Sequence, residues 1–203
     1  MRLLLIVDSH CCELVDIFTE LSDYSVYTVF VPNDIASITL QYRSEIQAIN
    51  QFRPEVTLIH MGHNDLVYHP SHNLSPSNSS TVASETITFA NETHINHPHS
   101  IIYVSAILPR SYTRRSLLSE AQVTAYNKIA KRHGQRARTY SKIAGYKCMI
   151  NNSMWKNISA SIEHSDYYLK DGLHLNRVGQ LALVSEWIQI LTPRPALPET
   201  TTT

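Results

Sequence analysis

Short apolar segments that alternate with helical patterns constrain the fold of this 203-residue chain more than any other feature. The first segment, Arg2–Val7, is almost entirely apolar, which is typical of a strand buried on both faces of a parallel sheet. Further strands of this kind are expected at 26–31, 55–61 and 101–108. Because helical patterns separate the first strands and follow the last, the sequence predicts an α/β protein with a mostly parallel sheet.

The helical segments have apolar residues at a spacing of three and four. They are expected at 10–23, 38–50, 119–134 and 176–191. The third begins with a capping-box pair, Ser119 and Gln122, and Gly134 is expected to end it. A fifth strand is then expected over 137–143. The polar stretch 69–84, which is rich in Ser, Asn, His and Pro, is expected to be a surface loop.

Composition predicts one domain over 1–192. Apolar residues make up 43% of the chain, enough for a substantial core, and the Pro- and Thr-rich end over 193–203 is expected to be disordered. No apolar run approaches the ~18–20 residues of a membrane span, and no signal peptide is recognisable. We therefore expect a cytoplasmic protein with reduced cysteines, and a nuclear location is also compatible with the sequence.

The net charge is zero, but the charges are unevenly distributed. Residues 1–109 include three basic and eleven acidic side chains, whereas residues 110–203 include fourteen basic and six acidic ones. The stretch 121–162 has eight basic residues and no acidic one. It could bind nucleic acid through phosphate contacts and base stacking, or it could be a solvated face balanced by the acidic half. The candidate nucleic-acid-binding residues are Lys128, Lys131, Arg132, Arg136 and Arg138.

Three polar clusters could carry chemistry. They are Asp8-Ser9-His10, Gly62-His63-Asn64-Asp65 and Asp171-Gly172-Leu173-His174. Each alone has an ordinary explanation as a helix cap or a turn. Together they supply a nucleophile, Ser9, a base, His174, and a carboxylate, Asp171, that orients the base. The Ser9 backbone N–H and the Asn64 amide would stabilise an oxyanion. Because chemistry in parallel sheets lies at the carboxyl ends of the strands, we expect these groups to meet there.

These clusters resemble blocks I, III and V of the SGNH (GDSL-type) hydrolases, in the same order and over nearly the whole chain. The resemblance implies a flavodoxin-like three-layer α/β/α sandwich with about five parallel strands. It also implies the same roles for Ser9, Asn64, Asp171 and His174, and no metal or organic cofactor. Short motifs such as Ile107-Leu108-Pro109-Arg110 further resemble SGNH domains carried by some animal retrotransposon open reading frames.

Two positions depart from the family pattern. Val7 stands where the family has the glycine before the Asp-Ser pair, and the block II glycine, an oxyanion donor, is absent. Ala36 or Ser37 lies where that glycine should be, and Ser37 is taken as the tentative third donor. Loss of one donor typically costs ~10²–10³ in rate. We therefore expect a weak serine esterase acting on small carboxylester, O-acetyl or thioester substrates, or alternatively an inactive domain of this fold that binds nucleic acid.

The eleven histidines match no tight zinc spacing, so no metal site is expected. Those at 60–72 and 94–99 are expected at the surface, where His63 could line the mouth of the site. Cys11 and Cys12 are expected to pack in the core rather than act as reactive thiols.

Overall fold

A five-stranded parallel sheet forms the centre of the computed structural model, which describes residues 1–8, 14–31, 34–66, 78–113, 116, 118–160 and 166–192. The strands lie in the order β2-β1-β3-β4-β5. Their bounds are Arg2–Val7 (β1), Ser25–Phe30 (β2), Val56–His60 (β3), Ile101–Ser105 (β4) and Lys147–Met149 (β5). All neighbouring pairs are parallel, so all strands end at the same edge. The prediction of an α/β fold is confirmed.

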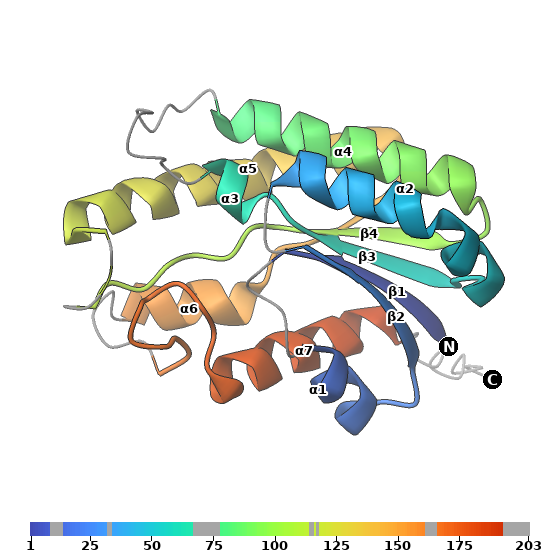
Figure 1. Cartoon of the computed structure of the whole chain (residues 1–203). Helices are drawn as coiled ribbons and strands as arrows, with labels where there is room; N and C mark the ends of the chain where they lie inside the picture. Colours follow the sequence, from blue (N-terminus) through green and yellow to red (C-terminus); the bar gives the residue numbers. More distant parts are fainter. Residues whose placement is uncertain are drawn as a thin grey trace, which may run out of the picture.

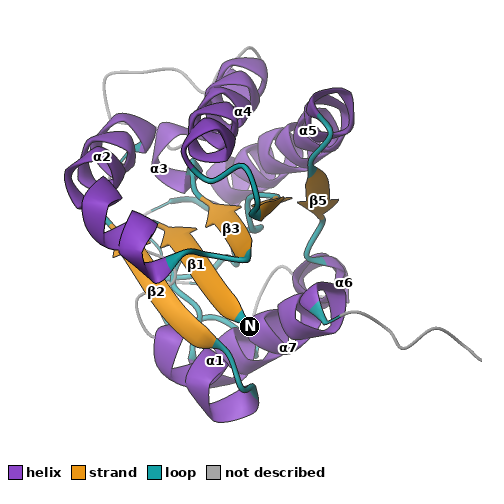
Figure 2. Ribbon diagram, turned by 90° about the vertical axis from the view of Figure 1, so that its right-hand side faces the viewer, coloured by secondary structure: helices purple, strands orange, loops and turns teal. Residues whose placement is uncertain are grey.

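Helices cover both faces of the sheet, which makes three layers (Figure 1). The first face carries α2 (Ile35–Phe52), α3 (His63–Leu66), α4 (Asn78–Asn96) and α5 (Glu120–Ala144). The second carries α1 (Leu14–Leu21), α6 (Asn152–Ala160) and α7 (Arg177–Leu191). Figure 2 shows the two helical layers on either side of the strands. None of the described helices is both long enough and apolar enough to cross a membrane.

The core has two halves because β1 presents apolar side chains to both faces. Leu3, Leu5 and Val7 belong to the cluster formed with α1, α6 and α7. Leu4 and Ile6 belong to the cluster formed with α2, α4 and α5. All five side chains are fully buried. This is the burial pattern that a continuous apolar run predicts for a central parallel strand.

The helix after β4 is longer than its sequence signals indicated. α5 continues past Gly134 to Ala144 and ends at Gly145, whose φ is 81°. The expected strand over 137–143 is therefore wrong, because these residues form the last turns of α5, and the fifth strand is β5. A Cβ at Gly134 would lie 3.3 Å from the Ala106 Cβ, so this glycine permits close packing against the end of β4 rather than ending the helix.

Three helices were not predicted, and the first of them is the short α3 after β3. Residues 78–84, expected to belong to a loop, begin α4, and α6 follows β5. α4 is rich in Ser, Thr and Asn, and its buried hydroxyls bond to carbonyls one turn back, as Thr86 does to Val82 and Thr93 to Phe89. Such a polar helix lacks the amphipathic signal that the prediction needed. The rest of the expected loop, 69–77, and the expected tail, 193–203, lie outside the described residues.

Candidate active site

Asp8 lies at the carboxyl end of β1 and is fully buried. Its carboxylate accepts the backbone N–H of His63 at 3.1 Å and is 2.9 Å from Nδ1 of the same residue. The His63 Nε2 accepts the backbone N–H of Leu108 at 3.0 Å, so the proton of the neutral ring is on Nδ1 and is donated to Asp8. Asp8 and His63 therefore connect the ends of β1 and β3 with the segment after β4. The segment that follows Asp8, which includes Ser9, Cys11 and Cys12, lies outside the described residues.

Burial corrects the expectation of surface positions for His60, His63 and His97. These side chains and that of His133 are at most 6% exposed. His60 is the last residue of buried β3, and its Nδ1 lies 3.0 Å from the Ser105 hydroxyl. Burial lowers the pKa of His60 to about 3 and that of His133 to about 4. Burial, with the positive charge of nearby Arg110, lowers the pKa of His63 well below 6.5.

Asp171 and His174 are hydrogen-bonded to each other in the loop before α7. The Asp171 Oδ2 lies 2.8 Å from His174 Nδ1, and Oδ1 accepts the backbone N–H groups of Leu173 and His174 at 2.8 and 3.0 Å. Partial burial alone would raise the pKa of Asp171, but the hydrogen bonds from His174 and Leu173 outweigh it and hold the pKa below its usual value. Both side chains are 40% exposed, so the pair is open to solvent and to a substrate.

The backbone of this loop is fixed from both sides. Tyr168 and Leu175 form an antiparallel bridge at its base. Gly172 has a φ of 70°, and its carbonyl accepts the Ser111 N–H at 2.9 Å. A Cβ at Gly172 would lie 2.0 Å from the Ser111 carbonyl oxygen, so only glycine fits. α7 then begins with Asn176, whose side chain accepts the Gly179 N–H at the helix N-terminus.

Asn64, the expected oxyanion donor, lies in α3 at the carboxyl end of β3 and is partly exposed. The turn before it requires Gly62, which has a φ of 101° and whose Cβ would lie 2.8 Å from the Val82 Cγ1. The tentative assignment of Ser37 is wrong, because its N–H is donated to the capping Asp34 carboxylate at 2.8 Å.

The other backbone amides in the first turn of α2 differ in their acceptors. The Ile35 N–H is donated to Asp65 at 3.2 Å, and the Ile38 N–H to the Asp34 carbonyl at 3.1 Å. The Ala36 N–H remains as the first-turn amide with no acceptor identified among the described residues, and Ala36 is exposed. Ala36 was the alternative to Ser37 in the sequence.

Asp65 connects α3, which carries Asn64, to the start of α2. Its Oδ2 accepts the Ile35 N–H, and Asp34 and Glu85 are its acidic neighbours. Burial, assisted by these two carboxylates, raises the pKa of Asp65 to about 6. The charge state of the connection between the two candidate oxyanion segments therefore changes near neutral pH.

A buried polar network supports the ends of β3 and β4, and no sequence pattern predicted it. Asn151 donates to the Ala106 carbonyl at 2.6 Å and accepts the indole N–H of Trp187 at 2.8 Å. It also contacts Ser105, which bonds to His60. Its φ of 56° is unusual for a residue other than glycine. These bonds fix the chain where it leaves β4 and β5.

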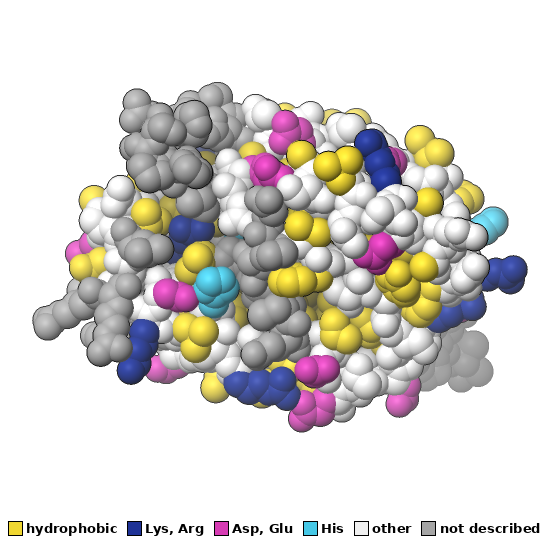
Figure 3. Space-filling model, in the orientation of Figure 1, with side chains coloured by type: hydrophobic (Ala, Val, Ile, Leu, Met, Phe, Trp, Pro, Cys, Tyr) yellow, Lys and Arg dark blue, Asp and Glu magenta, His cyan; other side chains and the backbone are white. Residues whose placement is uncertain are grey.

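The basic residues divide into a buried and an exposed group. Arg110, the first of the basic half, is 6% exposed and stacks over the Tyr126 ring at 4.3 Å, so it belongs to the interior. Most of the expected nucleic-acid-binding residues are exposed on α5: Lys128, Lys131, Arg132 and Arg138, with Arg136 partly exposed. None of them forms an ion pair within the described part of the chain. On the face in Figure 3, acidic and basic side chains are interspersed.

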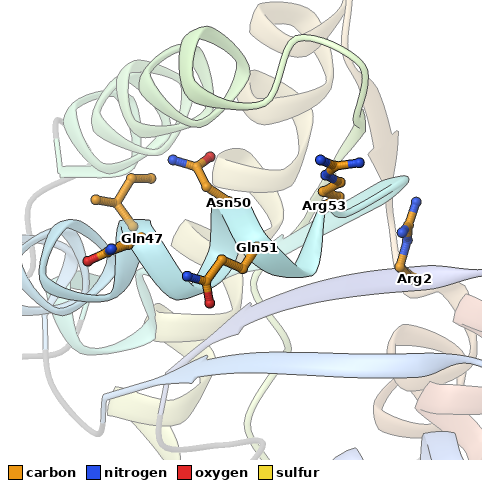
Figure 4. A pocket seen from close by; sticks show the side chains of 6 residues that line it. Arg2, Gln47, Asn50, Gln51 and Arg53 are labelled. Carbon is orange, nitrogen blue, oxygen red and sulfur yellow. The ribbon is translucent and has the colours of Figure 1, made fainter.

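One hollow lies away from the Asp171–His174 loop. It measures about 690 Å³ and lies at the amino-terminal edge of the sheet, where Arg2 begins β1 and Arg53 follows α2 (Figure 4). Amide side chains line the rest, and Arg2 is paired there with Glu55. Among the described residues, no group of three or more His, Cys, Asp and Glu side chains is placed to hold a metal ion.

Comparisons with known proteins identify the fold through structure alone. No protein-family model and no curated protein matches the sequence. An acetyl xylan esterase, AlAXEase, has a TM-score of 0.69 at 11% identity, over 95% of this chain and 100% of its own. A putative acylhydrolase from Bacteroides fragilis has a TM-score of 0.67 at 16% identity, over 93% of this chain and 85% of its own. The lipase/acylhydrolase from Enterococcus faecalis has a TM-score of 0.62 at 17% identity, over 97% of this chain and 100% of its own. The chain therefore has the three-layer α/β/α fold that GDSL-like lipases and acylhydrolases share.

Proposed function

We propose that the protein is a serine esterase of the SGNH type that hydrolyses small acyl esters through an acyl-enzyme on Ser9. The observation that carries the proposal is the Asp171–His174 pair, whose 2.8 Å bond orients one imidazole nitrogen. The loop that holds the pair is fixed by Gly172 and by the Tyr168–Leu175 bridge. A carboxylate that orients a histidine is the part of a catalytic triad that sets the tautomer of the base.

In this mechanism Nε2 of His174 takes the proton of the Ser9 hydroxyl as Oγ attacks the ester carbonyl. Asp171 accepts the Nδ1–H and stabilises the imidazolium that forms. When the tetrahedral intermediate collapses, His174 gives the proton to the leaving alcohol and the acyl group stays on Ser9. A water molecule, deprotonated by His174, then attacks the acyl-enzyme and releases the carboxylic acid.

Three donors are assigned to the oxyanion: the Ser9 N–H, the Asn64 side-chain amide and the Ala36 N–H. The Asp8–His63 bonds and the turn at Gly62 support Asn64 in this role, since they fix the backbone directly before it. An alanine in place of glycine has less backbone freedom, so we expect weak catalysis with one donor imperfectly aligned, which typically costs ~10²–10³ in rate.

The proposal is tested by hydrolysis of nitrophenyl esters from acetyl to octanoyl, which also defines the acyl preference. Ser9→Ala, His174→Gln and Asp171→Asn should each lower kcat/KM by at least about 10³, since triad members act as a unit. Ser84→Ala replaces an exposed serine on α4 and serves as the matched control. Equal rates for Ser9→Ala and the control would reject the proposal.

A second candidate is an inactive domain that binds single-stranded nucleic acid along the exposed face of α5. The observation that favours it is the set of exposed cations on that helix that form no ion pair with other described residues. Such binding would suit a domain carried in a retrotransposon reading frame. Binding to a single-stranded RNA should then be measurable at low salt and should weaken steeply as salt rises. Undetectable binding at low salt would exclude this candidate.

A further inference from the structure

A second hollow lies between α5 and α6, where β4 and β5 end, and its lining has the chemistry of a ligand site. Its volume is about 310 Å³, at the small end of the range for small-molecule sites. Its polar lining comes from α5 and α6. The residues that matter are Lys131, Gln135, Arg138, Asn152 and Trp155. The Asp171–His174 loop contributes none of the residues that line it.

Lys131 and Arg138 give this hollow a positive charge. Neither forms an ion pair among the described residues. Glu186 of α7 accepts the backbone N–H groups of Asn152 at 2.7 Å and Ser153 at 3.0 Å at the start of α6, and it forms no ion pair with either cation among the described residues. Two cations without an ion pair in the described part of the chain, about 10 Å apart along α5, favour an anion with several acceptor oxygens.

Trp155 adds an aromatic surface beside the two cations. Its side chain is partly exposed at the hollow, whereas the second tryptophan of the chain, Trp187, is fully buried. The amide groups of Gln135 and Asn152 can donate and accept hydrogen bonds at the edge of a ring or to a sugar hydroxyl. Gly134 and Ala106 form the base of the hollow, where the absence of large side chains leaves room.

We propose that this hollow, the α5–α6 pocket, binds one phosphorylated nucleotide unit, with the phosphate on Lys131 and Arg138 and the base stacked on Trp155. The combination of cations and an aromatic face distinguishes a nucleotide from inorganic phosphate, which has no ring, and from a neutral aromatic compound, which has no charge. The unit is either a free mononucleotide or part of a single strand. The proposal is independent of the esterase chemistry and narrower than binding along the whole of α5.

Tryptophan fluorescence of the full chain tests the proposal, because Trp155 is the partly exposed tryptophan and Trp187 is buried. Titration with UMP, with a ten-nucleotide uridine strand and with inorganic phosphate should give saturable quenching by the first two. Trp155→Phe should remove the signal, and calorimetry of this variant should show binding weakened about tenfold, from the loss of stacking. Lys131→Gln and Arg138→Gln should each weaken nucleotide binding at least about tenfold.

The matched control is Lys142→Gln, which removes an exposed cation one turn beyond Arg138 that does not line the pocket. It should change the affinity less than twofold, and Ser9→Ala should bind like the wild type whether or not the esterase proposal holds. Tighter binding of the strand would identify a single strand as the source of the nucleotide, and equal affinities a free nucleotide. An equal effect of Lys142→Gln and Arg138→Gln, equal affinity for inorganic phosphate, or no binding at millimolar UMP would overturn the proposal.

Discussion

The buried histidines predict that the protein loses stability steeply in mild acid. His60, His63 and His133 are neutral in the folded protein because burial lowers their pKa values, to about 3 for His60 and about 4 for His133. In the unfolded chain each binds a proton near pH 6.5, so the unfolded state holds more protons below that pH and stability falls as the pH falls. Each histidine lowers the free energy of unfolding by about 1.4 kcal/mol for every pH unit of acidification, and the three together by roughly 4 kcal/mol.

Asp65 has the opposite effect on stability as the pH falls. Its pKa of about 6 in the folded protein lies above the ordinary 3.8, so between these values the folded state holds the extra proton and gains stability as the pH falls. The expected net slope between pH 6 and 4.5 is therefore about 3 kcal/mol per pH unit. Against a typical stability of ~5–15 kcal/mol, this predicts acid unfolding within a few pH units.

Urea unfolding followed by circular dichroism from pH 7.5 to 4.5 measures this slope. His133→Leu is the sharpest variant, because both ring nitrogens of His133 are buried and lack hydrogen-bond partners within the described part of the chain. The variant should be more stable at pH 7 by about 1–3 kcal/mol, and its slope should fall by about 1.4 kcal/mol per pH unit. His99→Gln, which replaces an exposed imidazole, should leave the slope unchanged. A slope that is the same in His133→Leu and wild type would refute the reasoning.

Three further predictions concern the edges of the candidate site. Asp65→Asn keeps an acceptor for the Ile35 N–H but removes the charge. In urea unfolding it should therefore stabilise the protein by about 1–2 kcal/mol at pH 7.5 and not at pH 4. An effect that does not depend on pH would contradict the role of the charge. Gly172→Ala should lower stability by about 1–3 kcal/mol and remove most esterase activity, because the added Cβ collides with the Ser111 backbone. Unchanged thermal unfolding and unchanged activity would contradict this geometry. His63→Ala should cost about 3–5 kcal/mol in urea unfolding, since it removes the ring that bonds to the buried Asp8 carboxylate and accepts the Leu108 N–H. A loss below 1 kcal/mol would show that these ring contacts are dispensable.

The parallel sheet could be predicted from the sequence because its strands are continuous apolar runs and its strand ends carry polar clusters. Four strands and the final amphipathic helix follow directly from these patterns. The fifth strand could not, since β5 has only three residues and follows an α5 that contains Gly134 in its interior. α4 was missed because its buried face includes hydroxyls that bond to their own helix, which removes the periodic apolar signal.

Within the candidate site, local spacing was sufficient for Asp171 and His174, which are three residues apart and meet in one turn. It was not sufficient for contacts between distant segments. Nothing in the sequence pattern brings His63 to Asp8, separated by 55 residues, or buries Arg110 over Tyr126. The Ser37 assignment failed for a related reason, because the capping role of Asp34 uses the amide that the resemblance had reserved for the oxyanion.

The central claim is that Ser9 is a nucleophile activated by His174, and covalent labelling tests it most directly. The wild-type chain is incubated with a fluorophosphonate, and the modified residue is located by mass spectrometry of its peptides. The account predicts one adduct on Ser9, no adduct in Ser9→Ala, and labelling slowed by at least about 10² in His174→Gln, because the serine then lacks its base. Folded wild-type protein that stays unlabelled, or that carries the adduct on another residue, would contradict it.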